Sequence, residues 1–579
     1  MPSLLKFHVI VFSLLSAVMP RANGQGYLKT RGPLIVNEKN EKVILRGMGL
    51  GGWMLQEGYM FRLGNIGQQY RIREKIRELI GPERTQAFYD AWLGSHTTRK
   101  DIDSMAAWGF NSVRLPMHFN LYTLPADEEP VPGQNTWLEK GFALTDSLLN
   151  WCKANHMYLI LDLHAAPGGQ GNDLPISDRH PEKPSLWESE ANRNKTIALW
   201  RKLAARYANE PWIGGYDIIN EPNWGFEDPE DKKGTKETKN IPLKQLMKDI
   251  TKAIREVDQQ HIIIIEGNGF GNNYQGILPA WDSNMVISFH KYGNFTQVSS
   301  IPNFLDLREK YNIPLWLGES GENSNNWFTN TIAMVESNNI GWAWWQLKKM
   351  GINNPLEIKL TPGYQAILDY WNGKGPAPSA NEANQALMEF VNNTRLENNI
   401  YHKDVTDAMF RQVSSGKAIP FKEHIIKDRA VIRAVDYDLG RNLFAYNDLD
   451  TASYHYTPGV NTQGNRGYAY RNDGVDIRKD NNEFVVFHIE NGEWLQYTAW
   501  VASAGNYTLT IKIKTEADST SAKFNVSSNG KALVTNVEVP SSGAGVILKN
   551  IRFPQGENRI RITFVKGGAV FSEMIFERK

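Results

Sequence analysis

Cysteine is almost absent from this chain of 579 residues, which contains one, Cys152. A single cysteine cannot form a disulfide within the chain, and cysteine-based metal sites also need several, so both are excluded. Cys152 lies in a helical pattern with Leu148, Leu149 and Trp151. We therefore expect it to be a small core residue.

An excess of charge of either sign is also missing, because 64 basic and 63 acidic side chains leave a net charge of +1. This balance gives no electrostatic reason to bind nucleic acid or an anionic membrane surface. A neutral partner is indicated instead.

Long apolar runs are lacking too. The run HVIVFSLLSAVM follows Lys6 and precedes the small residues ANG before Gln25. It is too short to span a bilayer securely, and no later run is long enough. Its pattern resembles a secretory signal, so we expect residues 1–24 to be a signal peptide and the mature protein to be secreted, extracellular or periplasmic. A buried core helix is the alternative, because the charged region is thin.

Apolar runs of strand length are abundant between Lys42 and Leu347. There are eight: KVILRGMGL, NSVRLPM, YLILDLH, GGYDIINEP, HIIIIEG, MVISFHKY, PLWLGES and GWAWWQL. Most are continuously apolar, which is typical of parallel strands covered on both faces. Helical patterns such as 101–108, 144–155 and 243–257 lie between them. The alternation predicts an α/β fold, an eight-stranded (β/α)8 TIM barrel.

Polar residues stand at the ends of these runs: Arg114, His164, Asn220, Glu221, Glu266, His290, Tyr292, Glu319 and Trp345. In such a barrel the carboxyl ends of the strands form the active-site face. Any one of them is often only a hydrogen-bonded cap, but nine together indicate a site. Two carboxylates that meet across one cleft, Glu221 and Glu319, would suit a general acid and a nucleophile acting on a sugar acetal. Glu266 is the competing acid, or else a satisfied structural carboxylate.

The segments VRLP, DLHAAPGGQ, INEP, SFHKY, LGES and GWAWW resemble glycoside hydrolase family 5, the retaining β-glycosidases with an eight-stranded barrel. The resemblance covers roughly residues 25–371. It implies that Glu221 is the acid/base and Glu319 the nucleophile. It further implies that Asn220 hydrogen-bonds the sugar 2-hydroxyl and that Arg114 and Tyr292 hold Glu319 ionised and oriented. His164 and His290 would line the cleft, and Trp345 would be the floor on which the sugar stacks.

The segments RGMGLGGWMLQEG and DLHAAPGGQGND are closer to the exo-acting β-1,3-glucanase branch of that family. This implies that Glu57 contacts the glucose at the non-reducing end, although Gln56 and Gly58 depart from the leucine and proline usual there. The loops 121–135, 167–187 and 223–241 would wall the cleft into a pocket, or are solvated loops without that role. The resemblance implies no cofactor and no metal for the chemistry.

A change of composition follows Trp371, where GKGPAPSANEANQ is typical of a domain boundary. Helical material continues to about Gln412, and we have no functional interpretation of it. From about Ala430 apolar residues alternate with polar ones, and the residues 528–531, Ser-Asn-Gly-Lys, predict a hairpin. We therefore expect a barrel over 25–376, a helical or linking segment over 377–426, and an all-β sandwich (jelly-roll) over 427–579.

The segments VDYDLG, YRNDGVDI and GEWLQYTAWVASAGNYTL resemble a family 6 carbohydrate-binding module, which implies a glycan-binding sandwich with a structural calcium. In place of the usual Glu-Ala-Glu this chain has residues 433–435, Arg-Ala-Val, and so lacks two calcium-facing carboxylates. Val546 and Val570 stand where a sugar-facing Trp and Asn are usual. Tyr470 remains as a stacking platform for sugar, so the module either binds there or has lost the usual site.

These observations predict a secreted, retaining hydrolase of β-glucans or other β-linked oligosaccharides, similar to a β-glucosidase or exo-β-1,3-glucanase. An endo-β-1,4-glucanase (cellulase) and a β-1,6-glucanase are the nearer alternatives. A non-catalytic glycan-binding protein is the alternative from a different class. The sequence leaves linkage, endo or exo action and oligomeric state open.

Overall fold

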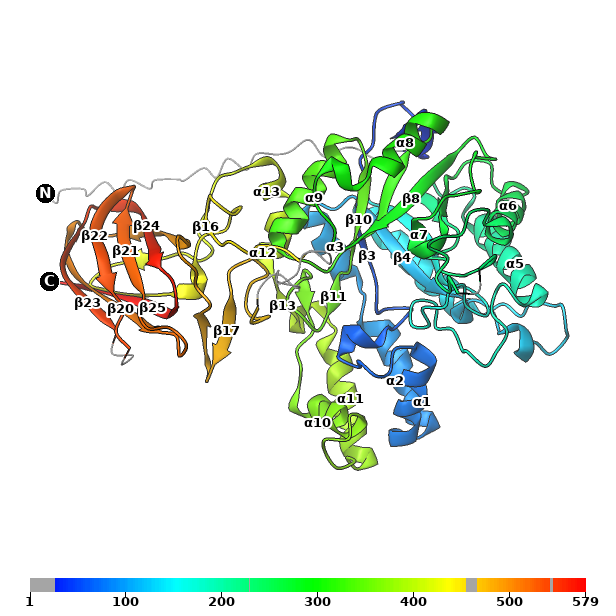
Figure 1. Ribbon diagram of the computed structural model, residues 1–579. Coiled ribbons are helices and arrows are strands. Elements are labelled where there is room, and N and C mark those ends of the chain that lie inside the picture. Colours follow the sequence, from blue (N-terminus) through cyan, green and yellow to red (C-terminus); the bar gives the residue numbers. More distant parts are fainter. Residues whose placement is uncertain (1–25, 229, 454–465, 542–544) are drawn as a thin grey trace, which may run out of the picture.

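The computed structural model describes residues 26–228, 230–453, 466–541 and 545–579. The predicted signal peptide, residues 1–24, lies outside these residues. Figure 1 shows a barrel with its helices and a β-rich carboxyl-terminal part, joined through a region of short helices and strands. Within the described residues no helix is both long and apolar enough to cross a membrane.

Eight parallel strands close into a barrel in the order β10-β3-β4-β5-β6-β7-β8-β9. The bounds of these strands are β3 Arg46–Gly49, β4 Ser112–His118, β5 Tyr158–Ala165, β6 Ile213–Asp217, β7 Ile263–Glu266, β8 Met285–Lys291, β9 Leu315–Gly321 and β10 Gly341–Trp345. Each of the eight predicted runs overlaps one of them. The predicted α/β barrel is therefore confirmed, because continuously apolar strands require cover on both faces.

Helices surround the barrel: α3 Arg99–Trp108, α4 Glu139–Ala154, α5 Glu190–Tyr207, α6 Ile241–Arg255, α8 Pro302–Tyr311 and α9 Asn325–Ser337, with the short α7 Asn268–Gly271. Their starts follow from local sequence. Thr98 and Asp101 form a capping box at α3, and the Ser189 and Ser324 side chains cap α5 and α9. Cys152 is buried on α4 among core residues, as predicted.

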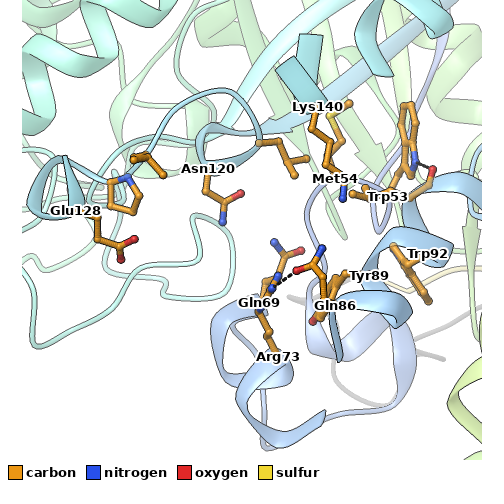
Figure 2. Close-up of a pocket in the computed structure, with 14 residues that line it drawn as sticks. Trp53, Met54, Gln69, Arg73, Gln86, Tyr89, Trp92, Asn120, Glu128 and Lys140 are labelled. Atoms are coloured by element: carbon orange, nitrogen blue, oxygen red, sulfur yellow. Dashed lines mark hydrogen bonds between the residues drawn. The ribbon is translucent and has the colours of Figure 1, made fainter. Parts of the chain in front are cut away.

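Four further helices pack together beside the barrel: α1 Gln69–Ile80, α2 Pro82–Ser95, α10 Pro362–Trp371 and α11 Ala380–Asn393. A cavity lies between α1, α2 and the segment that follows β4 (Figure 2). The segment 377–426 supplies α11, and also α12 Lys403–Met409 and α13 Arg411–Ser414, which contact α9. A small sheet of β11 Lys348–Lys349, β12 Leu356–Glu357 and β13 Ile400–Tyr401 ties this segment to the barrel.

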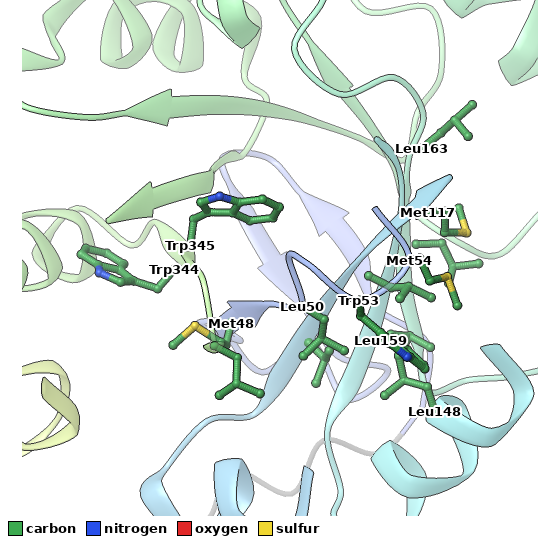
Figure 3. Packing of buried hydrophobic residues seen from close by; sticks show 14 of the residues in the cluster. Met48, Leu50, Trp53, Met54, Met117, Leu148, Leu159, Leu163, Trp344 and Trp345 are labelled. Carbon is green, nitrogen blue, oxygen red and sulfur yellow. The ribbon is translucent and has the colours of Figure 1, made fainter. Parts of the chain in front are cut away.

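The amino-terminal end of the barrel is closed by a hairpin, β1 Lys29–Arg31 and β2 Leu34–Val36. Leu28 and Ile35 share one buried cluster with Ile160, Ile264 and Trp316 of the barrel strands. A larger cluster fills the space between strands and helices, part of which Figure 3 shows. The opposite, carboxyl-terminal end is left for the polar residues.

Two six-stranded sheets form the carboxyl-terminal part and bury one common core. One sheet contains β14 Ile425–Ile426, β16 Tyr446–Asn447, β19 Trp494–Val501, β21 Lys523–Ser528, β22 Lys531–Glu538 and β24 Gly556–Lys566. The other contains β15 Arg429–Arg433, β17 Ile477–Asp480, β18 Glu483–Val486, β20 Gly505–Thr515, β23 Val546–Phe553 and β25 Ala569–Arg578. The predicted hairpin turn joins β21 to β22, and the pairing is antiparallel except between β14 and β19. This arrangement is consistent with the predicted sandwich.

The sandwich is anchored to the barrel at the start of α9. The Asn325 side-chain amide donates to Asp404 at 2.8 Å and to Asp473 at 3.1 Å, and its backbone N–H donates to the Asn472 carbonyl at 2.8 Å. All these groups are buried. Buried hydrogen bonds of this kind are costly to leave unmade, so they hold the two parts together.

Candidate active site

Glu221 and Glu319 lie at the carboxyl-terminal face of the barrel, four residues after the end of β6 and within β9. They are 7% and 6% exposed. One oxygen of each carboxylate and a ring nitrogen of His290 all lie within 4.8 Å of one another. The structure thus brings together the two carboxylates that the sequence singled out.

The backbone at Glu221 adopts a left-handed conformation, with φ of 42°, which is unfavourable for a side chain of this kind. Two buried side chains hold it: Glu266 Oε2 accepts from the Glu221 N–H at 2.8 Å, and Asn223 donates to the Glu221 carbonyl at 2.9 Å. Glu266 is fully buried. These contacts support the structural interpretation of Glu266, a carboxylate with satisfied hydrogen bonds that positions Glu221.

Two donors orient Glu319. Arg114 Nη1 donates to Oε2 at 2.8 Å and the Tyr292 hydroxyl donates to Oε1 at 2.7 Å. Arg114 is 1% exposed, so this charge-assisted bond is shielded from water. Both residues stand where the sequence analysis placed them, around the expected nucleophile.

Nη2 of the same guanidinium contacts four more side-chain oxygens: Asn220 Oδ1 at 2.7 Å, Asp217 Oδ2 at 3.0 Å, Glu266 Oε1 at 3.2 Å and Asp162 Oδ2 at 3.3 Å. Burial lowers the pKa of Arg114, but the charges of these carboxylates and of Glu319 raise it well above its usual value. Arg114 therefore stays positively charged.

Asp162 and Asp217 were missed by sequence reasoning. Both are fully buried within strands. Burial and the charge of Glu266 raise the pKa of Asp217 well above its usual value. The only signal was an acidic residue within the apolar stretch of each run, which does not show that the two side chains converge.

His290 lies between two carboxylates. Its Nδ1 is 2.6 Å from Glu221 Oε1, and its Nε2 is 3.1 Å from Glu266 Oε1. Burial lowers the pKa of His290, but the charges of Glu266, Glu319 and Glu221 outweigh it and raise the pKa well above its usual value. The raised pKa favours the imidazolium, which can donate through both nitrogens.

A charged His290 makes a pH-dependent contribution to stability. Because its folded-state pKa is raised above 6.5, the contribution is complete below about pH 6.5 and is lost as the pH rises toward the folded-state pKa. We expect the difference in unfolding free energy between wild type and His290→Gln, measured in urea, to fall by about 1.4 kcal/mol per pH unit above that point. A difference that stays constant from pH 6 to 9 would show a neutral ring.

A chain of side-chain contacts beside the two carboxylates links Asn220, His164 and Trp345. His164 Nδ1 bonds Asp162 Oδ2 at 2.8 Å and its Nε2 lies 3.2 Å from Asn220 Nδ2. The His164 ring is parallel to the Trp345 indole, with centroids 5.1 Å apart. His164 thus supports Trp345 in addition to lying beside the cleft.

The Trp345 ring is closely packed and 4% exposed. Glycines at 49 and 51 let the main chain approach it, because a Cβ at either would lie 2.7 Å from a ring atom. Its Nε1 donates to the Tyr59 hydroxyl at 2.7 Å. Figure 3 shows Trp344 and Trp345 pointing to opposite sides of β10. The floor role of Trp345 stays a prediction.

Glu57 precedes the 3-10 turn Gly58–Phe61 and is 6% exposed. Burial and the charges of Glu319 and Glu221 raise its pKa well above its usual value. The raised pKa favours the neutral form of Glu57, in which the carboxyl can both donate and accept a hydrogen bond. Tyr59, two residues later and 43% exposed, was missed by sequence reasoning.

Comparison with known proteins identifies the barrel. Residues 75–351 match the family model described as cellulase (glycosyl hydrolase family 5). The barrel is therefore similar to the family 5 glycosyl hydrolases. The protein is accordingly an O-glycosyl hydrolase.

Curated relatives agree with this similarity. A beta-xylosidase of Phanerodontia chrysosporium is 27% identical over 378 residues, covering 59% of this chain and 75% of the relative. Endoglucanase C of Acetivibrio thermocellus is 25% identical over 327 residues, covering 46% and 88%. A glucan 1,3-beta-glucosidase of Candida oleophila is 25% identical over 316 residues, covering 50% and 66%.

The carboxyl-terminal part matches a carbohydrate-binding module over residues 471–574. The matching model is family 35, so the family 6 assignment is corrected while the type of module stands.

The residues at 433–435 do not fit a calcium ion. Arg433 places its guanidinium on Asp436, with Nε to Oδ2 at 3.1 Å, and Val435 is buried. A fixed positive charge at this point opposes a cation.

Tyr470, the expected stacking platform, is half-buried in a polar cluster. Its hydroxyl donates to Asp436 and accepts from Lys422 at 2.8 Å. The Arg433 guanidinium lies over its ring at 5.0 Å, and Phe484 packs against it at 5.0 Å. Little of the ring is left for a sugar. A glycan role of Tyr470 stays a prediction that this packing does not favour.

Proposed function

We propose that the protein is a secreted, retaining β-glycoside hydrolase that cleaves O-glycosidic bonds of β-glucans by double displacement. The observation that supports this most is the closeness of Glu221 and Glu319, whose facing atoms lie within 4.8 Å. Retaining enzymes have carboxyl groups about 5 Å apart, whereas inverting enzymes need roughly 6.5–9.5 Å to admit a water molecule.

In the first step Glu319 attacks the anomeric carbon and the bond from that carbon to the leaving oxygen breaks. Arg114 and Tyr292 hold the attacking carboxylate in place. The leaving oxygen takes a proton from Glu221. Glu221 is the protonated acid in this step, and its Oε1 lies 2.6 Å from His290 Nδ1.

In the second step a water molecule replaces the departed group and attacks the anomeric carbon of the glycosyl-enzyme. Glu221 takes the water proton and the bond to Glu319 breaks, which restores the protonated Glu221 and the Glu319 carboxylate. Asn220, held by Arg114 at 2.7 Å, would bond the sugar 2-hydroxyl in both steps. Glu57 would bond a further hydroxyl of the same sugar.

For the substrate we propose a β-1,3-linked glucan or a β-glucoside cleaved from its end. The similarity of RGMGLGGWMLQEG to exo-acting enzymes and the 1,3-beta-glucosidase among the relatives support this. A β-1,4-glucan, a β-1,6-glucan or a β-xyloside is the alternative, favoured by the endoglucanase and beta-xylosidase relatives. Hydrolysis rates on laminarin, carboxymethyl-cellulose, pustulan and aryl β-glucosides and β-xylosides separate these.

We expect net retention of anomeric configuration. The spacing of Glu221 and Glu319 leaves no room for water between nucleophile and anomeric carbon, so two inversions must occur. Proton NMR of the first-formed product from a β-substrate should show the β-anomer before mutarotation. Initial release of the α-anomer would contradict the pairing of the two carboxylates.

Secretion is proposed from residues 1–24 alone. In a secreting host we expect the mature protein to begin near Gln25, which amino-terminal sequencing of the medium fraction measures. Retention of the full chain inside the cells would contradict it.

A further inference from the structure

The loop that follows the nucleophile strand contacts the sandwich. β9 ends at Gly321 and α9 begins at Asn325, so residues 322–324 connect them. The sandwich reaches this connection with two segments, residues 451–453 and 471–473, which both lie between β16 and β17. In Figure 1, α9 lies on the side of the barrel that faces the sandwich. We call the two segments the brace.

Asn323 is held by both segments of the brace. Its Nδ2 donates to the Ser453 carbonyl at 2.8 Å, and its Oδ1 accepts from the Ser453 N–H at 2.9 Å. Asn472 Nδ2 donates to the Asn323 carbonyl at 2.8 Å. All three residues are buried. Breaking any of these bonds would leave a buried polar group unpaired, which is costly, so the bonds fix Asn323 in one position.

The first residues of α9 are fixed in the same way. The Ser324 hydroxyl donates to the Thr451 carbonyl, and Asn326 Nδ2 donates to the Thr451 hydroxyl at 2.9 Å. The next residue of the brace, Ala452, belongs to the buried hydrophobic cluster between the barrel strands and their helices. The brace therefore packs as part of the barrel and not as a separate module on its surface.

The backbone that precedes Asn323 has an unfavourable conformation. Gly321 has φ of 142°, and Glu322 has φ of 52°. A Cβ at position 321 would lie 2.3 Å from the Trp345 carbonyl oxygen, so the chain needs glycine there. A left-handed conformation at a residue such as Glu322 persists only where the surrounding structure enforces it. The bonds from the brace to Asn323 provide that constraint.

Glu322 is linked to the groups around the nucleophile. Lys349 Nζ bonds Glu322 Oε1 at 2.8 Å, and the same ammonium lies over the Tyr59 ring at 5.6 Å. Burial and the charges of Glu319 and Glu322 raise the pKa of the Tyr292 hydroxyl well above its usual value. Glu322 therefore lies within electrostatic reach of Tyr292, which holds Glu319. A shift of Glu322 would disturb the environment of the nucleophile.

We propose that the sandwich is part of the catalytic unit, because the brace fixes the segment after Glu319, and that Asn323 and Asn472 are positioning residues for this nucleophile. The proposal rests on the proposed hydrolase function and deepens it. A module that only captured polysaccharide would change KM on polymers. The brace instead acts on the attack by Glu319, so its loss should lower kcat on small substrates as well.

The test isolates this attack in the full chain carrying Glu221→Gln. Dinitrophenolate leaves without an acid and deglycosylation is slow in that variant, so the burst from the preferred dinitrophenyl β-glycoside reports the attack by Glu319. The burst rate constant belongs to each folded site, whereas the burst amplitude counts the folded sites. Partial unfolding therefore lowers the amplitude alone. kcat is measured beside it for the same changes in the otherwise wild-type chain.

Two variants break the brace from either side, Asn472→Ala in the sandwich and Asn323→Ala in the barrel. Arg441→Ala is the matched control. It removes other bonds of the sandwich, from Arg441 Nε to the Gln412 carbonyl at 2.5 Å and from Nη2 to the Val413 carbonyl at 2.6 Å, and leaves the bonds of the brace in place.

We expect Asn472→Ala and Asn323→Ala each to lower the burst rate constant and kcat about tenfold or more, because a small displacement of a reacting group has effects of this size. The half-saturating substrate concentration should change less than about twofold, and Arg441→Ala should keep the control rates. Amide hydrogen exchange over residues 319–326, which does not depend on activity, should become faster in the two brace variants alone.

A loss confined to burst amplitude, unchanged rate constants in both brace variants, or unchanged exchange over 319–326 would overturn the proposal and leave the hydrolase function intact. A loss seen only as a higher KM on polymeric substrate would also overturn it, and would show a capture module instead. Wild type inert toward every β-glycoside would refute the proposed function, and with it the positioning role.

Discussion

Glu319→Ala is expected to reduce turnover of β-glycosides by about 10⁵-fold or more, as loss of a nucleophile does in other covalent mechanisms. Added azide or formate should restore part of it, with an α-glycosyl product. The physical reason lies in the groups that hold Glu319. Removing the carboxylate leaves space beside Arg114 Nη1 and the Tyr292 hydroxyl, two donors that would otherwise be unpaired. A small anion can bind there and attack the anomeric carbon.

The matched control is Glu309→Ala, an exposed carboxylate on α8. It should keep wild-type rates and show no response to azide. Substantial activity in Glu319→Ala without added anion would refute the nucleophile assignment. Rescue that gave a β-glycosyl azide would also refute it, because direct displacement from a β-substrate inverts the anomeric carbon once.

The strands of the barrel were predictable because their apolar runs are continuous, and the position of the site was predictable because polar residues end those runs. The partners of Arg114 were not. Asp162 and Asp217 stand inside runs that the apolar pattern assigns to the core, and only the closed barrel shows that their side chains converge on one guanidinium. The sequence also could not distinguish Glu266 from Glu221, because both lie near the end of a strand. The structure distinguishes them, because Glu266 is fully buried and accepts hydrogen bonds through both oxygens.

The packing of the long loops against α1 could not be derived from the sequence either. The loops 121–135 and 167–187 were recognised as long, with pocket wall and solvated loop as equal alternatives. Their approach to α1 depends on contacts between distant segments, such as Asp178 Oδ1 accepting from the Tyr70 N–H at 2.9 Å. In the sandwich the alternation of β20 was readable, but the cover of the Tyr470 ring by Arg433 was not.

Glu221→Gln is expected to separate the two steps of the mechanism. A natural glucan needs a proton on its leaving oxygen, so its hydrolysis should fall by about 10³-fold, within the usual range for general acid catalysis. Dinitrophenolate leaves without that proton, so the first step on a dinitrophenyl glucoside should be nearly unchanged. The second step should be slow, because no base remains to activate water. Stopped-flow absorbance should therefore show a burst of dinitrophenol and then a low steady rate.

The covalent intermediate that accumulates should be detectable by mass on the peptide containing Glu319, and azide should speed its breakdown to give a β-glycosyl azide. Glu266→Gln is the discriminating variant. Glu266 accepts hydrogen bonds from Arg114 and the Glu221 N–H and is fully buried, so its change should slow both steps together without a burst. A burst in Glu266→Gln and none in Glu221→Gln would show that the acid/base is Glu266 at the end of β7, and not Glu221 after β6. His290 contacts both carboxylates, so it could assist either one.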